Sequence, residues 1–290
     1  MAAIAWWELV NDWTEPLILK RLQEIKAKGW LKVSDHVSTF EHGQIGQSIE
    51  RLFNVDENND EAPDLPSSDG GKELKTLRTR STMWTLKHCS TYSKGMTPHE
   101  VFLKYAYPKK KRVSRKPDRY SLDPLYKRLS PQFGYNDFSS AVRKHTSSRA
   151  TIEIGDDIIS DYFSLRPGSI DGELEIHHRD DGYLASVDLR DKWKKLQRVV
   201  LVLCESDGVA GDPSEKFRIS HAFLLTEIKS ASALLKANIL SCTFSMSQSK
   251  PNHYPREKNR SDKYRISLPK NKATQLDKLS MVWKDVKQLV

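Results

Sequence analysis

Apolar residues in the first part of the chain recur at the spacing of amphipathic helices. Thr14 supplies a capping hydroxyl and Pro16 suits a first helical turn, so the pattern predicts a helix from Thr14 to Gly29. A second helix is predicted from Gly43 to Phe53. The predicted buried stripes are Leu17, Ile18, Leu22 and Ile25 in the first helix and Ile45, Ile49, Leu52 and Phe53 in the second.

Strand patterns alternate with helix patterns along the rest of the chain. Residues 72–77 alternate polar and apolar side chains after a turn rich in Ser, Asp and Gly, which is typical of a half-buried strand. Further strands are predicted at 199–205, 217–225, 239–246 and 264–268, and helices at 193–198 and 226–236. The alternation predicts an α/β fold with a mixed central sheet flanked by helices.

Length and composition favour a large folded protein. The 290 residues, of which 38% are hydrophobic, are enough for one large domain or for two lobes that share a cleft. Three widely spaced cysteines without a CxxC pair argue against a disulfide framework or a structural zinc site. No secretory leader and no apolar stretch of membrane-spanning length is recognisable, so we expect a cytoplasmic protein.

Charge is distributed unevenly. The formal net charge is +9, and residues 94–149 alone hold 14 Lys or Arg against four acids, a balance of +10. A basic segment of this size is typical of proteins that bind nucleic acid. Residues 56–73 instead hold seven acids and one lysine. A divalent cation that bridges carboxylates and phosphate would explain an acidic stretch in a protein that binds polyanions.

The run PKKKRVSRKPDR at residues 108–119 has too many charges and prolines for a core element, so an exposed basic loop or arm is predicted there. Its side chains would contact DNA phosphates without reading base sequence. The alternative is a solvated arm that makes no contact. The candidate phosphate contacts are Lys109, Lys110, Lys111, Arg112, Arg115 and Lys116.

The triplet Glu73-Leu74-Lys75 carries the candidate chemistry. Its glutamate and lysine share one face of a strand because side chains alternate with period two. Asp64 precedes the glycine-rich turn, where a hairpin would bring it beside Glu73. Phosphodiester hydrolysis needs a cation, a deprotonated water molecule and a positive group near the phosphate. We therefore predict that Asp64, Glu73 and the Leu74 carbonyl bind Mg²⁺, and that Lys75 positions the water and helps to deprotonate it. A solvated strand face is the alternative for any Glu-x-Lys triplet.

The stretch GQIGQSIERLFNVDENNDEAPDLPSSDGGKELKT (residues 43–77) resembles the catalytic segment of MutH-like nucleases of the PD-(D/E)xK superfamily, and most of all that of the MvaI/BcnI-type monomeric type II restriction endonucleases. The resemblance continues at residues 216–246 and at KYRI (263–266), but not in the insert near 105–150. It implies a restriction-endonuclease-like core with two lobes around a DNA cleft. It also implies that Asp64 and Glu73 are metal ligands, that Lys75 is the catalytic lysine, and that Glu50 supports the site from a helix.

This chain departs from those relatives in the length of one gap. Eight residues separate Asp64 from Glu73, and Asp69 lies among them. Asp69 could therefore be the metal ligand, with Asp64 capping a turn. Because Asp69 directly precedes Gly70-Gly71, an ideal turn position, Asp64 is the favoured ligand.

The loop KPNHYPREKNRSDKYR at residues 250–265 mixes side chains that can read base edges in the major groove. In the family that the chain resembles, the corresponding loop reads target bases, so recognition is expected here. The candidate DNA-binding residues of this loop are His253, Arg256, Lys258, Asn259, Arg260, Asp262 and Arg265.

The resemblance implies a monomeric, Mg²⁺-dependent type II restriction endonuclease that cuts a specific double-stranded DNA sequence and leaves 5′-phosphate ends. It implies no obligate protein partner, and a cognate methyltransferase that acts on the same DNA site. We expect a catalytic lobe with the basic insert over residues 1–150, and the remaining sheet with a recognition lobe over 151–290. The rival hypotheses are a mismatch-repair strand nickase of the MutH kind and a non-catalytic DNA-binding protein.

Overall fold

The chain packs into two compact units, each assembled from separate stretches of sequence. A computed structural model describes residues 10–37, 43–55, 62–81, 83–89, 92–112, 120–129, 132–134, 163–244, 246–247, 262–268 and 274–290. The first unit comprises Met1–Thr82, Trp193–Lys229 and Leu268–Val290, and the second comprises Met83–Lys192 and Ser230–Ser267. The lobe boundary expected near residue 150 lies outside the described residues and stays a prediction.

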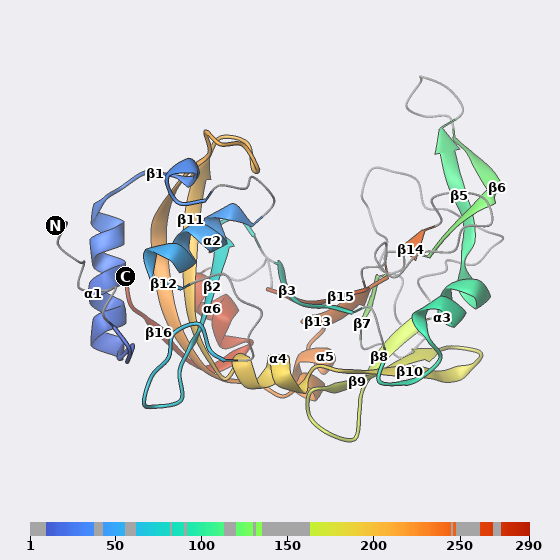
Figure 1. Ribbon diagram of the computed structural model, residues 1–290. Helices are drawn as coiled ribbons and strands as arrows, with labels where there is room; N and C mark the ends of the chain where they lie inside the picture. The colour runs from blue at the N-terminus through green and yellow to red at the C-terminus, as the bar shows by residue number, and fades with distance from the viewer. Residues whose placement is uncertain are drawn as a thin grey trace. The chain divides into compact units, whose positions relative to one another are not determined.

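The first unit is built on a five-stranded mixed sheet (Figure 1). Its strands have the order β1-β12-β11-β2, and β16 also pairs with β12. The central strand β11 runs antiparallel to β12 and parallel to β2. The elements are α1 (Glu15–Ala27), β1 (Leu31–Lys32), a 3₁₀ turn η2 (Val33–Asp35), α2 (Gln44–Leu52), β2 (Glu73–Arg78), β11 (Arg198–Asp207), β12 (Lys216–Ile228), α6 (Gln275–Ser280) and β16 (Trp283–Gln288). The boundary between the units falls within α4 (Arg190–Lys195), whose second half belongs to the first unit.

Burial on both faces explains the apolar run of β11. Alternate residues Val200, Val202 and Cys204 join the core cluster that also contains the buried side of α1 and of α2. The intervening Val199, Leu201 and Leu203 are buried as well. A strand covered on both faces is continuously apolar rather than alternating. The buried stripes predicted for α1 and α2 enter this core, with Ile18, Leu22 and Ile25 from α1 and Ile45, Ile49, Leu52 and Phe53 from α2.

In its described residues, the second unit consists of antiparallel sheets with the short helices α3 and α5. Its described sheets have the strand orders β4-β10-β9-β8, β3-β15-β13-β7 and β14-β6-β5. The elements are β3 (Met83–Cys89), β4 (Lys94–Gly95), α3 (Pro98–Tyr105), β5 (Tyr107–Arg112), β6 (Tyr120–Leu129), β7 (Gln132–Gly134), β8 (Phe163–Pro167), β9 (Glu173–His178), β10 (Gly182–Asp188), α5 (Ala231–Lys236), β13 (Leu240–Thr243), β14 (Met246–Ser247) and β15 (Asp262–Ser267). In the part of the chain that the structure describes, no helix is long and apolar enough to cross a membrane.

The predicted mixed α/β fold is confirmed, whereas three local predictions were wrong. The helix expected at 193–198 ends at Lys195, because Arg198 already pairs with Thr226 in the sheet. The helix expected at 226–236 begins only at Ala231, since β12 pairs with β16 as far as Ile228. Tertiary pairing overrides local propensity in such segments.

The third correction concerns the basic segment. Its first half is not a loop but strand β5, which pairs with β6 from Tyr107 to Arg112. The four basic residues Lys109–Arg112 therefore belong to a β-hairpin. Cross-strand hydrogen bonds form through the backbone, so they do not depend on the charge of the side chains.

A buried arginine ties α1 to the end of α2. Arg21 is 1% exposed, and its Nε donates a hydrogen bond to the Leu52 carbonyl at 2.7 Å. Its guanidinium also lies 3.3 Å from Glu24. A helix leaves its last carbonyls without partners inside the helix, so this bond satisfies one of them and fixes where α2 ends.

We expect Arg21→Met to lower the free energy of unfolding by about 2 kcal/mol, because the substitution leaves a buried carbonyl without its charged donor. Urea denaturation followed by circular dichroism measures the change. Lys20→Met, at an exposed position of the same helix, is the matched control and should stay within about 0.5 kcal/mol of the parent chain. Equal effects of the two substitutions would contradict the role of the bond.

Candidate active site

A short antiparallel pairing brings Asp64 beside the edge strand β2. Leu65 and Lys72 exchange two backbone hydrogen bonds, each 2.9 Å long. The turn between them needs glycine at position 71, where φ is +71° and a Cβ would come within 2.6 Å of the Pro63 side chain. This pairing is the hairpin that the sequence predicted, and it places the segment of Asp64 next to Glu73.

The Asp64 carboxylate is bonded to the backbone of the strand that carries the triplet. Its Oδ2 accepts a hydrogen bond from the Leu74 N–H at 2.9 Å. In an extended strand the N–H and C=O of one residue point to the same side. The Leu74 carbonyl therefore faces the segment of Asp64, away from β11. The Leu74 side chain is buried in the core, so Glu73 and Lys75 project from the opposite face of β2.

Glu73 is a buried carboxylate with one oxygen available to a ligand. Glu73 is only 6% exposed. Oε1 lies 2.7 Å from the ammonium of Lys75, while Oε2 lies 3.8 Å from Lys195 and has no hydrogen-bond partner among the described residues. Buried polar atoms of this kind call for a partner. The oxygen atoms of Asp64, Glu73 and the Leu74 carbonyl therefore fit a hard divalent cation.

The donor set is small, which favours a cation that keeps water ligands. Within the described residues, no group of three or more His, Cys, Asp or Glu side chains is arranged to hold a metal ion. Two carboxylates and one carbonyl would leave the remaining positions to water, as Mg²⁺ commonly has in proteins.

Lys75 is a half-buried cation held among carboxylates. Its Nζ lies 2.7 Å from Glu73 and 3.7 Å from Asp64. Burial lowers the pKa of Lys75, but the nearby charges of Glu73, Asp64 and Glu50 outweigh burial and raise the pKa above its usual value. Lys75 is therefore an ammonium ion at neutral pH. α2, which carries the half-buried Glu50, contacts β2, which carries Lys75.

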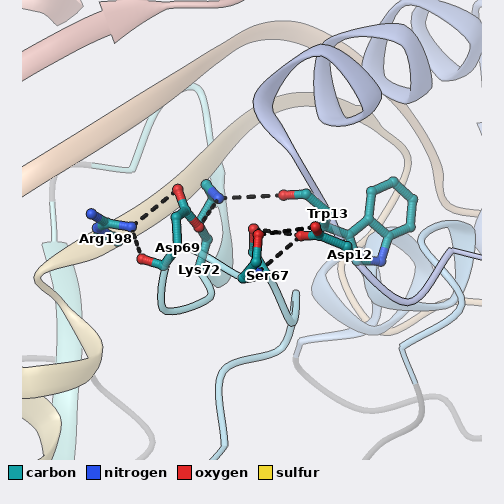
Figure 2. A network of polar contacts seen from close by, with 7 residues as sticks. Asp12, Trp13, Ser67, Asp69, Lys72 and Arg198 are labelled. Atoms are coloured by element: carbon teal, nitrogen blue, oxygen red, sulfur yellow. Dashed lines mark hydrogen bonds and ion pairs between the residues drawn. The ribbon is translucent and has the colours of Figure 1, made fainter.

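Asp69 takes part in a different set of contacts, which Figure 2 shows. Its carboxylate lies 2.9 Å from the buried ammonium of Lys72 and 3.1 Å from the guanidinium of Arg198. Lys72 also donates to the Trp13 carbonyl at 3.3 Å. Hydrogen bonds from Lys72 and Ser67 lower the pKa of Asp69, so it remains ionised. Asp69 anchors the loop, whereas Asp64 is the aspartate that reaches Lys75 and Leu74.

The same loop is also held from the amino-terminal segment. Asp12 accepts hydrogen bonds from the Ser67 hydroxyl at 2.9 Å and from the Ser68 backbone at 3.0 Å (Figure 2). The bonds from Ser68 and Ser67 lower the pKa of Asp12. The extra length of the gap between Asp64 and Glu73 is therefore an ordered loop.

Lys195 is a site residue that the sequence analysis missed. It ends α4, is only 17% exposed, and lies 3.8 Å from Glu73 while donating to the Ala62 carbonyl at 3.3 Å. A cavity of about 230 Å³ adjoins it, with Pro63, Gly71, Glu73, Lys194 and Arg198 among its lining residues. The signal that the sequence offers is that Lys195 comes just before the apolar run of β11. The structure adds that β11 pairs with β2, the strand of the Glu-x-Lys triplet.

The predicted DNA-binding residues lie apart from this site in the chain. Lys109–Arg112 belong to β5, and Asp262 and Arg265 belong to β15, whose strand begins earlier than expected. Arg265 is half-buried and pairs with Ser241 and Thr85. Seven predicted residues fall outside the described part of the chain: Arg115, Lys116, His253, Arg256, Lys258, Asn259 and Arg260.

Comparison with known proteins agrees with the geometry. A model of the MvaI/BcnI restriction endonuclease family matches residues 19–274. The structure "Restriction endonuclease MvaI-cognate DNA substrate complex" has a TM-score of 0.57 and 15% identity, over 99% of this chain and 100% of that chain. "Restriction endonuclease MvaI in the absence of DNA" has a TM-score of 0.43 and 13% identity, over 97% and 100%. A comparison with curated protein sequences finds no match.

The first of these structures shows that the fold is shared with MvaI, which confirms the fold expected from the resemblance. The family model spans most of the sequence and includes α2, β2, α4, β11 and β12. It therefore covers every residue of the candidate site, from Glu50 to Lys195. On this evidence the chain belongs to the MvaI/BcnI restriction endonuclease family.

Proposed function

We propose that this chain is a Mg²⁺-dependent type II restriction endonuclease that hydrolyses double-stranded DNA at a specific sequence and leaves 5′-phosphate and 3′-hydroxyl ends. The observation that carries the proposal is the buried Glu73 carboxylate: one of its oxygens contacts Lys75, and the other has no hydrogen-bond partner in the part of the chain that the structure describes. Family membership supports a site-specific nuclease. The related MvaI structure is described as a complex with cognate DNA, which supports DNA as the substrate.

Each side chain has a distinct task in this proposal. Asp64, Glu73 and the Leu74 carbonyl hold the cation. When bound, Mg²⁺ withdraws charge from the phosphate and lowers the pKa of a water molecule. Lys75, an ammonium ion between the two carboxylates, orients the water and offsets negative charge that develops on the phosphate. The charge of Glu50 adds to those of Glu73 and Asp64, which together raise the pKa of Lys75.

The proposal also covers the location of the enzyme, its oligomeric state and its partner enzyme in the cell. We place the enzyme in the cytoplasm, acting as a monomer, with a cognate methyltransferase that modifies the same DNA sequence. The strand β5 with its lysines, and the segment around residues 250–265, remain the proposed phosphate-contacting and base-reading regions. Arginine and asparagine in the second region suit guanine and adenine edges.

We expect Glu73→Ala and Lys75→Ala to lower the rate of plasmid cleavage at least ~100-fold while DNA binding persists, because each removes an electrostatic group from the reaction centre. Asp64→Asn should have the same effect. Asp69→Asn is the matched control: it alters the loop anchor and should retain most of the cleavage rate. If Asp69→Asn lost activity while Asp64→Asn kept it, the assignment of the metal ligand would be reversed.

Removal of divalent cations should abolish cleavage, because the proposed cation both activates the water and stabilises the phosphate. Cleavage of plasmid DNA is measured after treatment with EDTA and again after Mg²⁺ is restored in excess. Full recovery is the expected result. Cleavage that continues in EDTA would contradict the proposed metal dependence.

Mapping cut sites on both strands of a cleaved plasmid distinguishes restriction from strand nicking. We expect cuts on both strands at one repeated sequence, with a nicked intermediate, since each chain offers one described site. Persistent cuts on a single strand would favour the nickase of the MutH kind. A protein that binds the plasmid yet never cuts it with Mg²⁺ would be a non-catalytic DNA-binding protein.

A further inference from the structure

Glu73 lies between two ammonium groups that come from different elements. Lys75 of β2 contacts Oε1 at 2.7 Å, and Lys195 of α4 lies 3.8 Å from Oε2. The chain therefore places a second cation beside the oxygen for which the described residues offer no hydrogen-bond partner. An ammonium at this position competes with a metal ion for the carboxylate, since both are attracted by the same charge.

Lys195 also holds the segment that leads to Asp64. Its Nζ donates to the Ala62 carbonyl at 3.3 Å, two residues before Asp64. One lysine thus contacts both stretches of chain that carry the candidate carboxylate ligands. Its side chain is only 17% exposed, so the ammonium lies against the site rather than in bulk solvent.

The cavity beside Lys195 has an excess of positive charge. Among the described residues, Lys194, Lys195 and Arg198 line it on the side of α4 and β11, and Glu73 is the carboxylate of the lining. Arg198 is also paired with Asp69 at 3.1 Å, outside the lining. Cationic side chains thus outnumber carboxylates in this lining, which suits an anion with oxygen acceptors such as a phosphate diester.

We propose that Lys195 is an exchangeable counter-ion: it neutralises Glu73 in the chain without metal, and it contacts a phosphate of the DNA backbone in this cavity once a cation occupies Glu73. The inference rests on the function proposed above. The bound cation repels the ammonium of Lys195, and the phosphate oxygen replaces the carboxylate as its partner. Lys195 thus contacts the DNA strand next to the metal site, a task separate from that of Lys75.

The first test measures metal binding without DNA. Mn²⁺ is titrated calorimetrically into the full chain and into Lys195→Gln, which should bind at least about threefold more tightly because the competing cation is gone. Lys229→Gln is the matched control, since Lys229 also donates to a carbonyl, that of Ser280 at 2.8 Å, in the same unit. It should bind Mn²⁺ as the parent chain does.

The second test measures DNA binding in the presence of Mg²⁺, in the Lys75→Ala background that prevents cleavage. Adding Lys195→Gln should weaken binding of plasmid fragments and reduce the slope of log affinity against log salt concentration by about 0.9, the value for one phosphate contact. Lys195→Arg keeps the charge and should restore the slope, and Lys229→Gln should leave it unchanged.

If Lys195 exchanges Glu73 for a phosphate, Lys195→Gln must both tighten Mn²⁺ binding and reduce the salt slope of DNA binding. Weaker Mn²⁺ binding by Lys195→Gln, or an unchanged salt slope, would overturn the inference and leave Lys195 as a structural link to Ala62. Failure of the proposed function looks different, because the unsubstituted chain would then cut no DNA with Mg²⁺. If the parent chain cuts DNA while Lys195→Gln matches it in both titrations, only the counter-ion inference falls.

Discussion

The antiparallel contact between Leu65 and Lys72 is the constraint on which the candidate site depends. Its paired backbone hydrogen bonds bring Asp64 alongside β2, and the ammonium of Lys72 is buried at 3% exposure. A buried charge is tolerated only when it is paired and hydrogen-bonded. Asp69 and the Trp13 carbonyl meet that need, so the position of the loop follows from the partners of one lysine. Of the acidic stretch at residues 56–73, Asp64 and Glu73 thus belong to the candidate site, and Asp69 supports its loop.

The two carboxylates of the candidate site, Asp64 and Glu73, each have an ammonium group nearby. Lys75 lies between Asp64 and Glu73, and Lys195 faces the other side of Glu73. Such an arrangement lets the centre fold before a metal ion is present, because carboxylates clustered without cations would repel one another. In the proposed function the same lysines are the positive groups that face a phosphate once a cation binds. Under that proposal, folding of the site and its chemistry draw on the same side chains.

Much of the first unit was predictable because its local patterns agree with its tertiary packing. The buried stripes of α1 and α2, the alternation of β2 and the apolar run of β11 each report the environment that the structure provides. The hairpin to Asp64 was predictable from its turn residues. Lys195 was not, because its approach to Glu73 arises from the parallel pairing of β11 with β2 across more than a hundred residues. Pairing between strands also explains why the loop predicted from the basic residues was wrong at β5. Its backbone pairs with β6, which the charges of its side chains do not indicate.

The interleaving of the two units has a consequence for synthesis of the protein. The whole of the stretch Met83–Lys192 lies between β2 and its parallel neighbour β11, and β12 follows later still. A ribosome makes about 5–20 residues per second, so the amino-terminal third emerges well before the strands that complete its sheet. Pairing over such long separations also slows folding. A partly made chain therefore presents the Glu-x-Lys strand without its sheet, and a potentially damaging enzyme stays unassembled until β11 and β12 have left the ribosome.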